Sequence, residues 1–341
     1  MFYKGMQINF TGMIQIVDPD DCTPQRAKLP EDLPFPQAKK TSMQTQPQKD
    51  EFKRITKGQI NDIKKYPQFG RSDCYLVASL KSLAKSGFGK QMLKNSVSSN
   101  QDKTSYNVEF KRYADDAKNT YNANNKDYNN TLAYVVATGR PTFNSLGAIE
   151  KATSDINGDK SSTKPWVLRA FGKYDTNLEG NLASYFMKNL TGVDPINIGD
   201  NGLRSLASAN KEKATKLLDK IGEYPMNRHS FVCGSKVMGT EKVGTSHYFV
   251  LNKVDNKEKK VYLRNPRYAD ISKPEVKDYI VDSCKLSSNL NTKKRIDEVI
   301  KMYENDEKQI CLTYDEFMND FRSIVGYFDK KVVKDYDVNQ K

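Results

Sequence analysis

The sequence predicts an α+β fold, with a helical half ahead of a half built from antiparallel strands. Over residues 51–195, apolar side chains recur mainly at three- and four-residue intervals, the period of a helix with one buried face. Over residues 196–328 the pattern changes to alternation of apolar and polar side chains, which is typical of strands that bury one face. The chain has 341 residues and is 37% hydrophobic, so it can bury a sizeable core in one large domain or two.

The first 50 residues differ from the rest in composition. They carry five prolines between Pro19 and Pro36 and a run rich in Ser, Gln and Lys at 41–50. A segment of this kind has too little apolar surface to offset the entropy lost on folding. We therefore predict a mostly disordered leader at 1–50, with one short strand at Gln7–Phe10. It would serve as a flexible tail or as a propeptide or docking segment.

The two halves each contain several expected elements. In the helical half, 51–195, we expect helices near 51–64, 74–86, 109–120, 130–137, 144–153 and 178–190. In the β-rich half, 196–328, we expect strands at 230–237, 247–254, 260–265, 279–282 and 309–313. Helices near 202–221, 292–305 and 314–324 would accompany these strands, and a charged tail at 329–341 would follow.

Charge and hydropathy restrict the partners. The formal net charge is +13, but there is no dense Lys/Arg run, so most of this charge is expected to be solvated and nucleic acid is not expected as a partner. No window of 18 apolar residues occurs, so we expect no membrane span. Residues 1–17 lack the continuous apolar stretch of a signal peptide, which makes a cytoplasmic location the default and leaves non-classical export open.

The chain contains five cysteines, at positions 22, 74, 233, 284 and 311. An odd number without zinc-ligand spacing favours reduced thiols over a disulfide framework. Cys74 stands apart because Pro67 and Gly70 mark a turn before it, and Ser72 or Asp73 can cap a helix that starts with it. The positive end of a helix dipole favours the thiolate, which is the nucleophilic form. Most free cysteines are nevertheless buried and inert, so Cys74 alone does not establish catalysis.

A thiol nucleophile needs a base, and the chain has two histidines, His229 and His247. His229 lies in a polar stretch before a strand, where a surface role is expected. His247 starts an apolar strand, and Asn265 ends the next one after a turn sequence around Asn256. A hairpin centred on Asn256 would set His247 directly opposite Asn265, with Cβ atoms roughly 5 Å apart. The Asn carboxamide could then fix the imidazole tautomer, although a one-residue slip would separate the two side chains.

The segment 68–80 contains Gln68, then Asp73-Cys74 six residues later, then small and apolar helix residues. It resembles the active-site signature of calpain-like cysteine proteases of the papain superfamily, which has a Gln and then Gly-Asp-Cys-Trp-Leu. Ser72 and Tyr75 replace the family's Gly and Trp. Four later segments resemble further family motifs in the family's order; these are Leu178–Gly192, Thr245–Tyr248, Leu263–Pro266 and Ile310–Phe317.

The resemblance implies a papain-like two-lobed fold. The helical lobe would carry Cys74, and the β-rich lobe would carry His247 and Asn265. In this family the cysteine attacks a peptide carbonyl, and the backbone N–H of the cysteine together with the Gln68 amide would stabilise the oxyanion. The function implied is a cysteine endopeptidase, expected to be a monomer, that cleaves protein or peptide substrates.

Two positions depart from the family pattern. Arg267 stands where the family has a Trp that shields the His–Asn hydrogen bond, so the effect of Arg267 on efficiency is open. Lys65 stands where calcium-regulated members have an acidic residue, and a cation opposes Ca²⁺ binding. The sequence also shows no EF-hand loop pattern. We therefore expect activity without calcium, and no cofactor or metal.

Two alternatives use the same residues. The chain could be a catalytically weak calpain-like module that binds proteins, although such a module has no need to keep Gln68, Cys74, His247 and Asn265 together. It could also be a thiol acyltransferase, which passes the acyl group to an amine rather than to water. Product analysis with an added amine separates transfer from hydrolysis.

Overall fold

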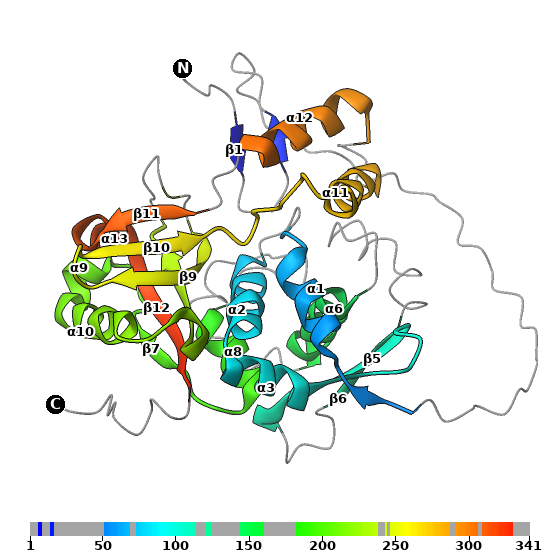
Figure 1. The fold of residues 1–341 in the computed structure, drawn as a ribbon, viewed down its shortest axis with the longest axis horizontal. Coiled ribbons are helices and arrows are strands. Elements are labelled where there is room, and N and C mark those ends of the chain that lie inside the picture. Colours follow the sequence, from blue (N-terminus) through cyan, green and yellow to red (C-terminus); the bar gives the residue numbers. More distant parts are fainter. Residues whose placement is uncertain are drawn as a thin grey trace, which may run out of the picture.

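The computed structural model describes residues 6–8, 14–16, 51–68, 73–113, 120–124, 144–159, 182–237, 243, 246–286, 291–305 and 309–329. These residues combine helices with antiparallel sheets, as the α+β prediction requires (Figure 1). The helix expected near 130–137, most of the leader and most of the charged tail lie outside the described residues.

A six-stranded antiparallel sheet forms the second half of the chain (Figure 1). Its strands in spatial order are β11 (Ile310–Thr313), β10 (Lys260–Arg264), β9 (Tyr248–Asp255), β8 (His229–Ser235), β12 (Phe321–Phe328) and β7 (Ile196–Ile198). Four of them match the strands expected at 230–237, 247–254, 260–265 and 309–313. His247 directly precedes β9 and Asn265 directly follows β10, and these two strands pair side by side in antiparallel orientation.

The strand β12 was not expected, because the prediction continued a helix to residue 324. The helix α13 (Tyr314–Asp320) does begin as expected, with a capping box between Thr313 and Glu316. It stops at Asp320, and the next eight residues, apart from Arg322, are aromatic, β-branched or small and pair with β7 and β8. High strand propensity and two partners therefore override the helical spacing.

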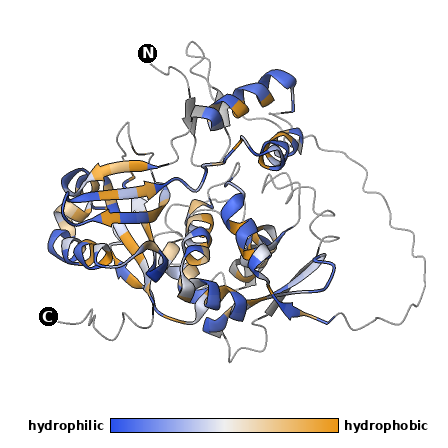
Figure 2. Cartoon of the chain, in the orientation of Figure 1, coloured by the Kyte–Doolittle hydropathy of each residue, from blue (hydrophilic) through white to orange (hydrophobic). Residues whose placement is uncertain are grey.

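The two faces of the six-stranded sheet pack against different helices (Figure 2). One face packs against α2 (Cys74–Lys85) and α8 (Ala183–Thr191), and the other against α9 (Leu206–Ala209), α10 (Lys211–Gly222) and α13. Alternation in β9 shows the division: Tyr248 and Val250 join the core around α2, whereas Phe249 and Leu251 join the core around α10. Both faces are buried, which fixes the register of the strands.

The first half contains helices at most of the expected positions. They are α1 (Lys57–Lys65), α2, α6 (Ser145–Asp159) and α8, whereas a further helix, α3 (Gly87–Ser96), was not expected. The helix α2 ends at Lys85, close to the predicted end at residue 86, and Gly87 begins α3. Gly89 is required by packing, because a Cβ there would lie 2.2 Å from the Leu83 carbonyl oxygen.

A four-stranded antiparallel sheet also lies in the first half, where the prediction gave mainly helices. Its strands are β3 (Lys53–Arg54), β4 (Val97–Ser99), β5 (Ser105–Glu109) and β6 (Thr120–Asn124). The helix expected near 109–120 does not form at the described residues of this segment, because β5 ends at Glu109, a 3₁₀ turn, η1, spans Lys111–Tyr113 and β6 starts at Thr120. In β5 the side chains of Tyr106 and Val108 are buried in the core, two residues apart. So short an alternation cannot be distinguished in the sequence from the spacing of a helix.

Between β10 and β11 the chain forms two helices, α11 (Pro274–Leu286) and α12 (Lys293–Asn305), with a small core of their own. The strand suggested at 279–282 is wrong, since these residues lie inside α11. Val276, Ile280 and Cys284 recur every four residues and are buried on one helix face. The pair packs beside α1 through Tyr66, whose ring lies 4.7 Å from that of Tyr279 (Figure 1).

Near the N-terminus two short strands pair, β1 (Met6–Ile8) and β2 (Ile14–Ile16). The first overlaps the strand expected at Gln7–Phe10, and the second was not expected. Across the described part of the chain, none of the helices combines the length and apolar composition needed to cross a bilayer.

Candidate active site

Cys74 is the first residue of α2, and its side chain is 7% exposed. Asp73 occupies the capping position, but its side chain does not cap the helix as the sequence suggested. Its carboxylate instead accepts a hydrogen bond of 3.0 Å from the Gln68 side-chain amide. Ser72, the other predicted cap, lies outside the described residues. The helix therefore presents the thiol and its own backbone N–H beside Gln68.

Gln68 is buried and held by its main chain as well as its side chain. Its N–H donates to the Pro266 carbonyl oxygen at 3.0 Å, which joins this segment to the end of β10. Its carbonyl accepts from the Tyr303 hydroxyl of α12 at 3.1 Å. Gln68 thus lies next to both the Cys74 helix and the Asn265 segment.

His247 and Asn265 meet as the sequence predicted. The Nε2 of His247 lies 3.0 Å from the Oδ1 of Asn265, and the backbone N–H of Arg267 donates to the same oxygen at 3.0 Å. Because this oxygen accepts, the imidazole carries its proton on Nε2, and Nδ1 keeps a lone pair. The ring also packs edge-on against Phe249, with centroids 4.9 Å apart. The pair has the orientation that a base and its orienting amide need.

The register that brings them together differs from the predicted one. Leu251 is opposite Leu263, whereas the prediction set it opposite Val261. The pairing shifts by one residue between Tyr262 and Leu263, where β9 contains one extra residue, Asn252. Continued by one residue, the ladder sets Asn265 opposite Phe249, so His247 and Asn265 are diagonal neighbours on one face rather than direct partners.

The thiol of Cys74 lies against the backbone that precedes β9. Its Sγ is 4.0 Å from the Ser246 carbonyl oxygen, and within the described residues no hydrogen bond joins it to the His247 ring. Ser246 has φ of 47°, the left-handed region that non-glycine residues rarely adopt. Burial raises the pKa of the Cys74 thiol to about 11, against the opposing effects of the Tyr248 N–H and the Arg267 charge.

His247 is buried at 8% exposure, and its main chain is paired on both sides with Ser235. Burial, with a smaller contribution from the Arg267 charge, lowers the pKa of the imidazole to about 3, while the bond to Asn265 acts in the opposite direction. In this conformation thiol and imidazole are therefore both neutral.

Sequence reasoning missed a buried network beside this site. The Tyr248 hydroxyl donates to the Asp200 carboxylate at 2.6 Å, and Ser184 donates to the same carboxylate through its backbone N–H at 2.9 Å and its hydroxyl at 2.6 Å. Ser184 is in the first turn of α8, so Asp200 connects that helix to the residue after His247. Asp200 carries no periodic signal in the sequence, which is why it was not recognised.

Two lysines of α2, Lys81 and Lys85, were also missed. Both donate to backbone carbonyls: Lys81 to Pro266, just after β10, at 2.9 Å, and Lys85 to Leu251 in β9 at 2.6 Å. Two lysines spaced by four residues in an otherwise apolar helix are a detectable signal, since a buried lysine needs acceptors.

The described residues hold no group of three or more His, Cys, Asp or Glu side chains arranged to bind a metal ion. Lys65, the position discussed for calcium, forms an ion pair of 2.9 Å with Glu275 of α11. No protein-family model matches the chain, and a search of curated proteins finds no matching relative.

Proposed function

We propose that this chain is a thiol-dependent endopeptidase whose nucleophile is Cys74 and whose base is His247. The observation that carries the proposal is the 3.0 Å contact between His247 Nε2 and Asn265 Oδ1, formed beside a cysteine at the start of a helix. The arrangement leaves Nδ1 of the imidazole as the basic nitrogen. We further propose that the helical and β-rich halves are the two lobes of a papain-like fold.

The first step is a proton transfer from the Cys74 thiol to Nδ1 of His247. The thiolate then adds to the peptide carbonyl carbon, and the carbonyl oxygen takes the negative charge. The Cys74 backbone N–H and the Gln68 amide stabilise this oxyanion, and losing such a donor typically slows the reaction ~10²–10³-fold. The imidazolium protonates the leaving amine as the C–N bond breaks. Water, deprotonated by neutral His247, releases the acyl group and restores the thiol.

The thiol must leave the Ser246 carbonyl before it can reach the imidazole. This requires a rotation about the Cys74 side chain, because its hydrogen bond now points to the main chain rather than to Nδ1. The Arg267 charge favours the thiolate once it forms. The proposed enzyme therefore passes through a rearrangement that pairs Cys74 with His247 before chemistry starts.

One observation favours a second candidate, a protein-binding module with weak activity. The thiol donates a hydrogen bond to the Ser246 carbonyl oxygen, and burial raises its pKa to about 11. Both effects oppose nucleophilic attack. Acyl transfer to an amine remains the third candidate, since it uses the same groups.

The test is intact-mass labelling with an epoxide directed at cysteine proteases, followed by hydrolysis of a denatured protein substrate. Wild type is compared with Cys74→Ala and His247→Ala, each in EDTA and in Ca²⁺. Cys311→Ala is the matched control, because Cys311 is an exposed thiol on the edge strand β11.

We expect wild type and Cys311→Ala to form one adduct each, in EDTA as well as in Ca²⁺. Cys74→Ala and His247→Ala should form none. Hydrolysis should produce new amino termini from the substrate in the same variants that form the adduct, and in EDTA as well. An adduct without hydrolysis would favour the binding module, and transfer of the acyl group to added amine would favour the transferase. Labelling that persists in His247→Ala would sink the Cys–His pair.

A further inference from the structure

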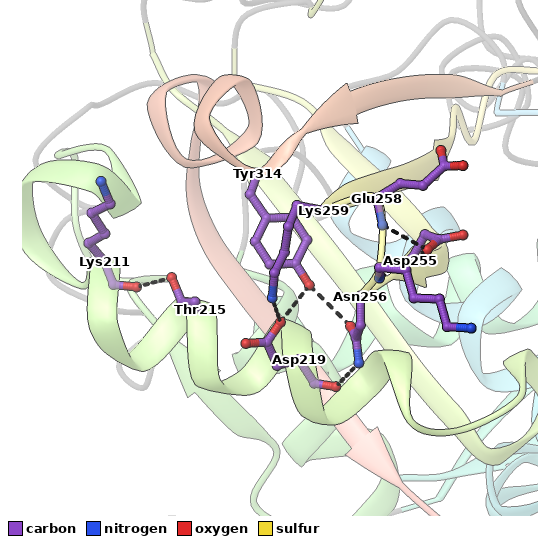
Figure 3. Close-up of polar contacts among 9 residues, drawn as sticks. Lys211, Thr215, Asp219, Asp255, Asn256, Glu258, Lys259 and Tyr314 are labelled. Atoms are coloured by element: carbon purple, nitrogen blue, oxygen red, sulfur yellow. Dashed lines mark hydrogen bonds and ion pairs between the residues drawn. The ribbon is translucent and has the colours of Figure 1, made fainter.

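The hairpin of β9 and β10 is fixed at its turn by contacts with α10 and α13 (Figure 3). Asn256 donates to the Asp219 carbonyl oxygen at 2.7 Å, and Tyr314 donates to the Asp219 carboxylate at 3.0 Å. Lys259 forms an ion pair with that carboxylate at 2.8 Å. These contacts hold the turn so that Asp255 is opposite Lys260.

That turn register alone would not bring His247 and Asn265 together. If this register continued unchanged, Asn265 would lie opposite Val250. The side chains of Val250 and His247 are on opposite faces of the sheet, so Asn265 would then point away from His247. The extra residue Asn252 shifts the register by one and moves Asn265 opposite Phe249, on the face of His247. The bulge at Asn252 is therefore the feature that makes the His–Asn contact possible.

The C-terminal end of α2 lies where β8 and β9 stop pairing. The ladder between these strands ends at Val232 and Val250, one residue before the bulge region. Beyond it, Ser82 donates to the Phe231 carbonyl of β8 at 3.0 Å, and Lys85 donates to the carbonyls of Leu251 at 2.6 Å and Asn252 at 3.5 Å in β9. Side chains of α2 thus replace the missing ladder bonds.

We propose that Lys85 is a positioning residue that holds the β9 bulge and so aligns His247 with Asn265. The inference rests on the proposed function only in treating this pair as catalytic. Burial lowers the pKa of Lys85 to about 7, but the ammonium and the neutral amine each carry at least two N–H hydrogens, so either form can donate to two carbonyls at a bulge. No carboxylate among the described residues forms an ion pair with Lys85, so these carbonyls are its partners.

Lys81 acts on the other strand of the hairpin. Its ammonium donates to the carbonyl oxygen of Pro266, the residue after Asn265, at 2.9 Å. The helix that begins with Cys74 therefore binds both strands that carry the pair. One rigid element sets the position of the thiol, of the His247 strand and of the Asn265 strand.

The experiment uses the two histidines as probes. The ¹⁵N shifts of both imidazoles are measured in the full chain, with His229→Gln for assignment. The variants are Lys85→Met, which removes every donor, and Lys85→Arg, which keeps donors and charge. Lys213→Met is the matched control, because Lys213 is an exposed lysine of α10.

We expect His247 to be a single Nε2–H tautomer in wild type, in Lys85→Arg and in Lys213→Met. In Lys85→Met the two ring nitrogens should move toward averaged shifts, and exchange of the Nε2 proton with water should accelerate at least tenfold. Should Lys85→Met not fold, Lys85→Gln, which keeps one amide donor group, decides the question by an intermediate change.

A folded Lys85→Met or Lys85→Gln with the wild-type tautomer and exchange rate would overturn the proposal. The proposal would also be overturned if Lys85→Arg showed the same averaged ring-nitrogen shifts as Lys85→Met. The readout needs no hydrolysis, so it remains decisive if epoxide labelling fails and the endopeptidase proposal falls.

Discussion

At the scale of single residues, Arg267 influences both partners of the proposed reaction. Its backbone N–H donates to the Asn265 oxygen, and its charge acts on both partners of the proposed reaction. A Trp there would exclude water from the His–Asn bond. An arginine instead adds a positive charge, which favours a thiolate and opposes an imidazolium.

We predict that Arg267→Gln raises the pKa of Cys74 and that of His247. The reason is the same for both groups, since removing a nearby cation makes proton binding easier. The midpoint of Cys74 alkylation by iodoacetamide should move to higher pH, and alkylation below that midpoint should slow several-fold. The NMR titration of His247 should also move upward. Arg204→Gln, at an exposed arginine, is the control, and equal curves for both variants would contradict the prediction.

At the scale of elements, Asp200 connects α8 to β9. Its carboxylate accepts from Tyr248, from Ser323 and twice from Ser184, all in the interior. The Arg322 guanidinium lies 5.9 Å from the Tyr248 ring centre and donates to the Gly202 carbonyl. Burial and the Asp200 charge raise the pKa of Tyr248 well above its usual value, so Tyr248 remains a donor. The residue after His247 is thereby fixed to a helix of the other half.

Asp200→Ala should lower the free energy of unfolding by about 3–5 kcal/mol, because it leaves several buried donors without an acceptor. Tyr248→Phe should cost about 1–3 kcal/mol, since it removes one donor and leaves the carboxylate its other partners. Urea unfolding measures both. The control is Asp194→Asn, which removes an exposed ion pair with Lys188 and should cost less than about 1 kcal/mol.

The double variant should be less destabilised than the sum of the two single changes, because both remove the same contact. Full additivity would mean that Tyr248 and Asp200 act independently, contrary to the 2.6 Å bond between them.

At the scale of the whole molecule, the two halves share a core. The cluster around α2 contains side chains of α1, α6 and α8 and also Val232, Tyr248 and Val325 of the sheet. Both histidines are buried: His247 is 8% exposed, and His229 is 1% exposed at the start of β8, contrary to the surface position expected from the sequence. Burial, with a smaller effect of the Lys85 charge, lowers the pKa of His229 to about 3.

Acid should therefore unfold the protein through its histidines. A histidine with a folded pKa near 3 and an ordinary pKa of about 6.5 in the unfolded chain binds protons mainly when unfolded. Stability is complete above the unfolded value and falls as pH drops from about 6.5 toward 3. Protonation linked to each histidine should lower the free energy of unfolding by about 2 kcal/mol between pH 7 and pH 5.

His229→Phe isolates one of these contributions. The ring fits among apolar neighbours such as Phe231, and no described residue is a hydrogen-bond partner of Nδ1. Urea unfolding is measured at pH 7 and at pH 5. Between these two pH values the free energy of unfolding should fall by about 2 kcal/mol less in the variant than in wild type. An unchanged loss would mean that His229 is accessible to protons in the folded state.

The sequence by itself determined the α+β class, the helix that starts at Cys74 and the hairpin strands, and it predicted that His247 and Asn265 would meet. Local spacing carries this information, because helices and strands bury faces of different period. The tertiary structure alone decided the strand β12, the first-half sheet, the helical form of 279–282 and the register of the hairpin. Register depends on one extra residue, Asn252, and on bonds from α2, which no local pattern contains.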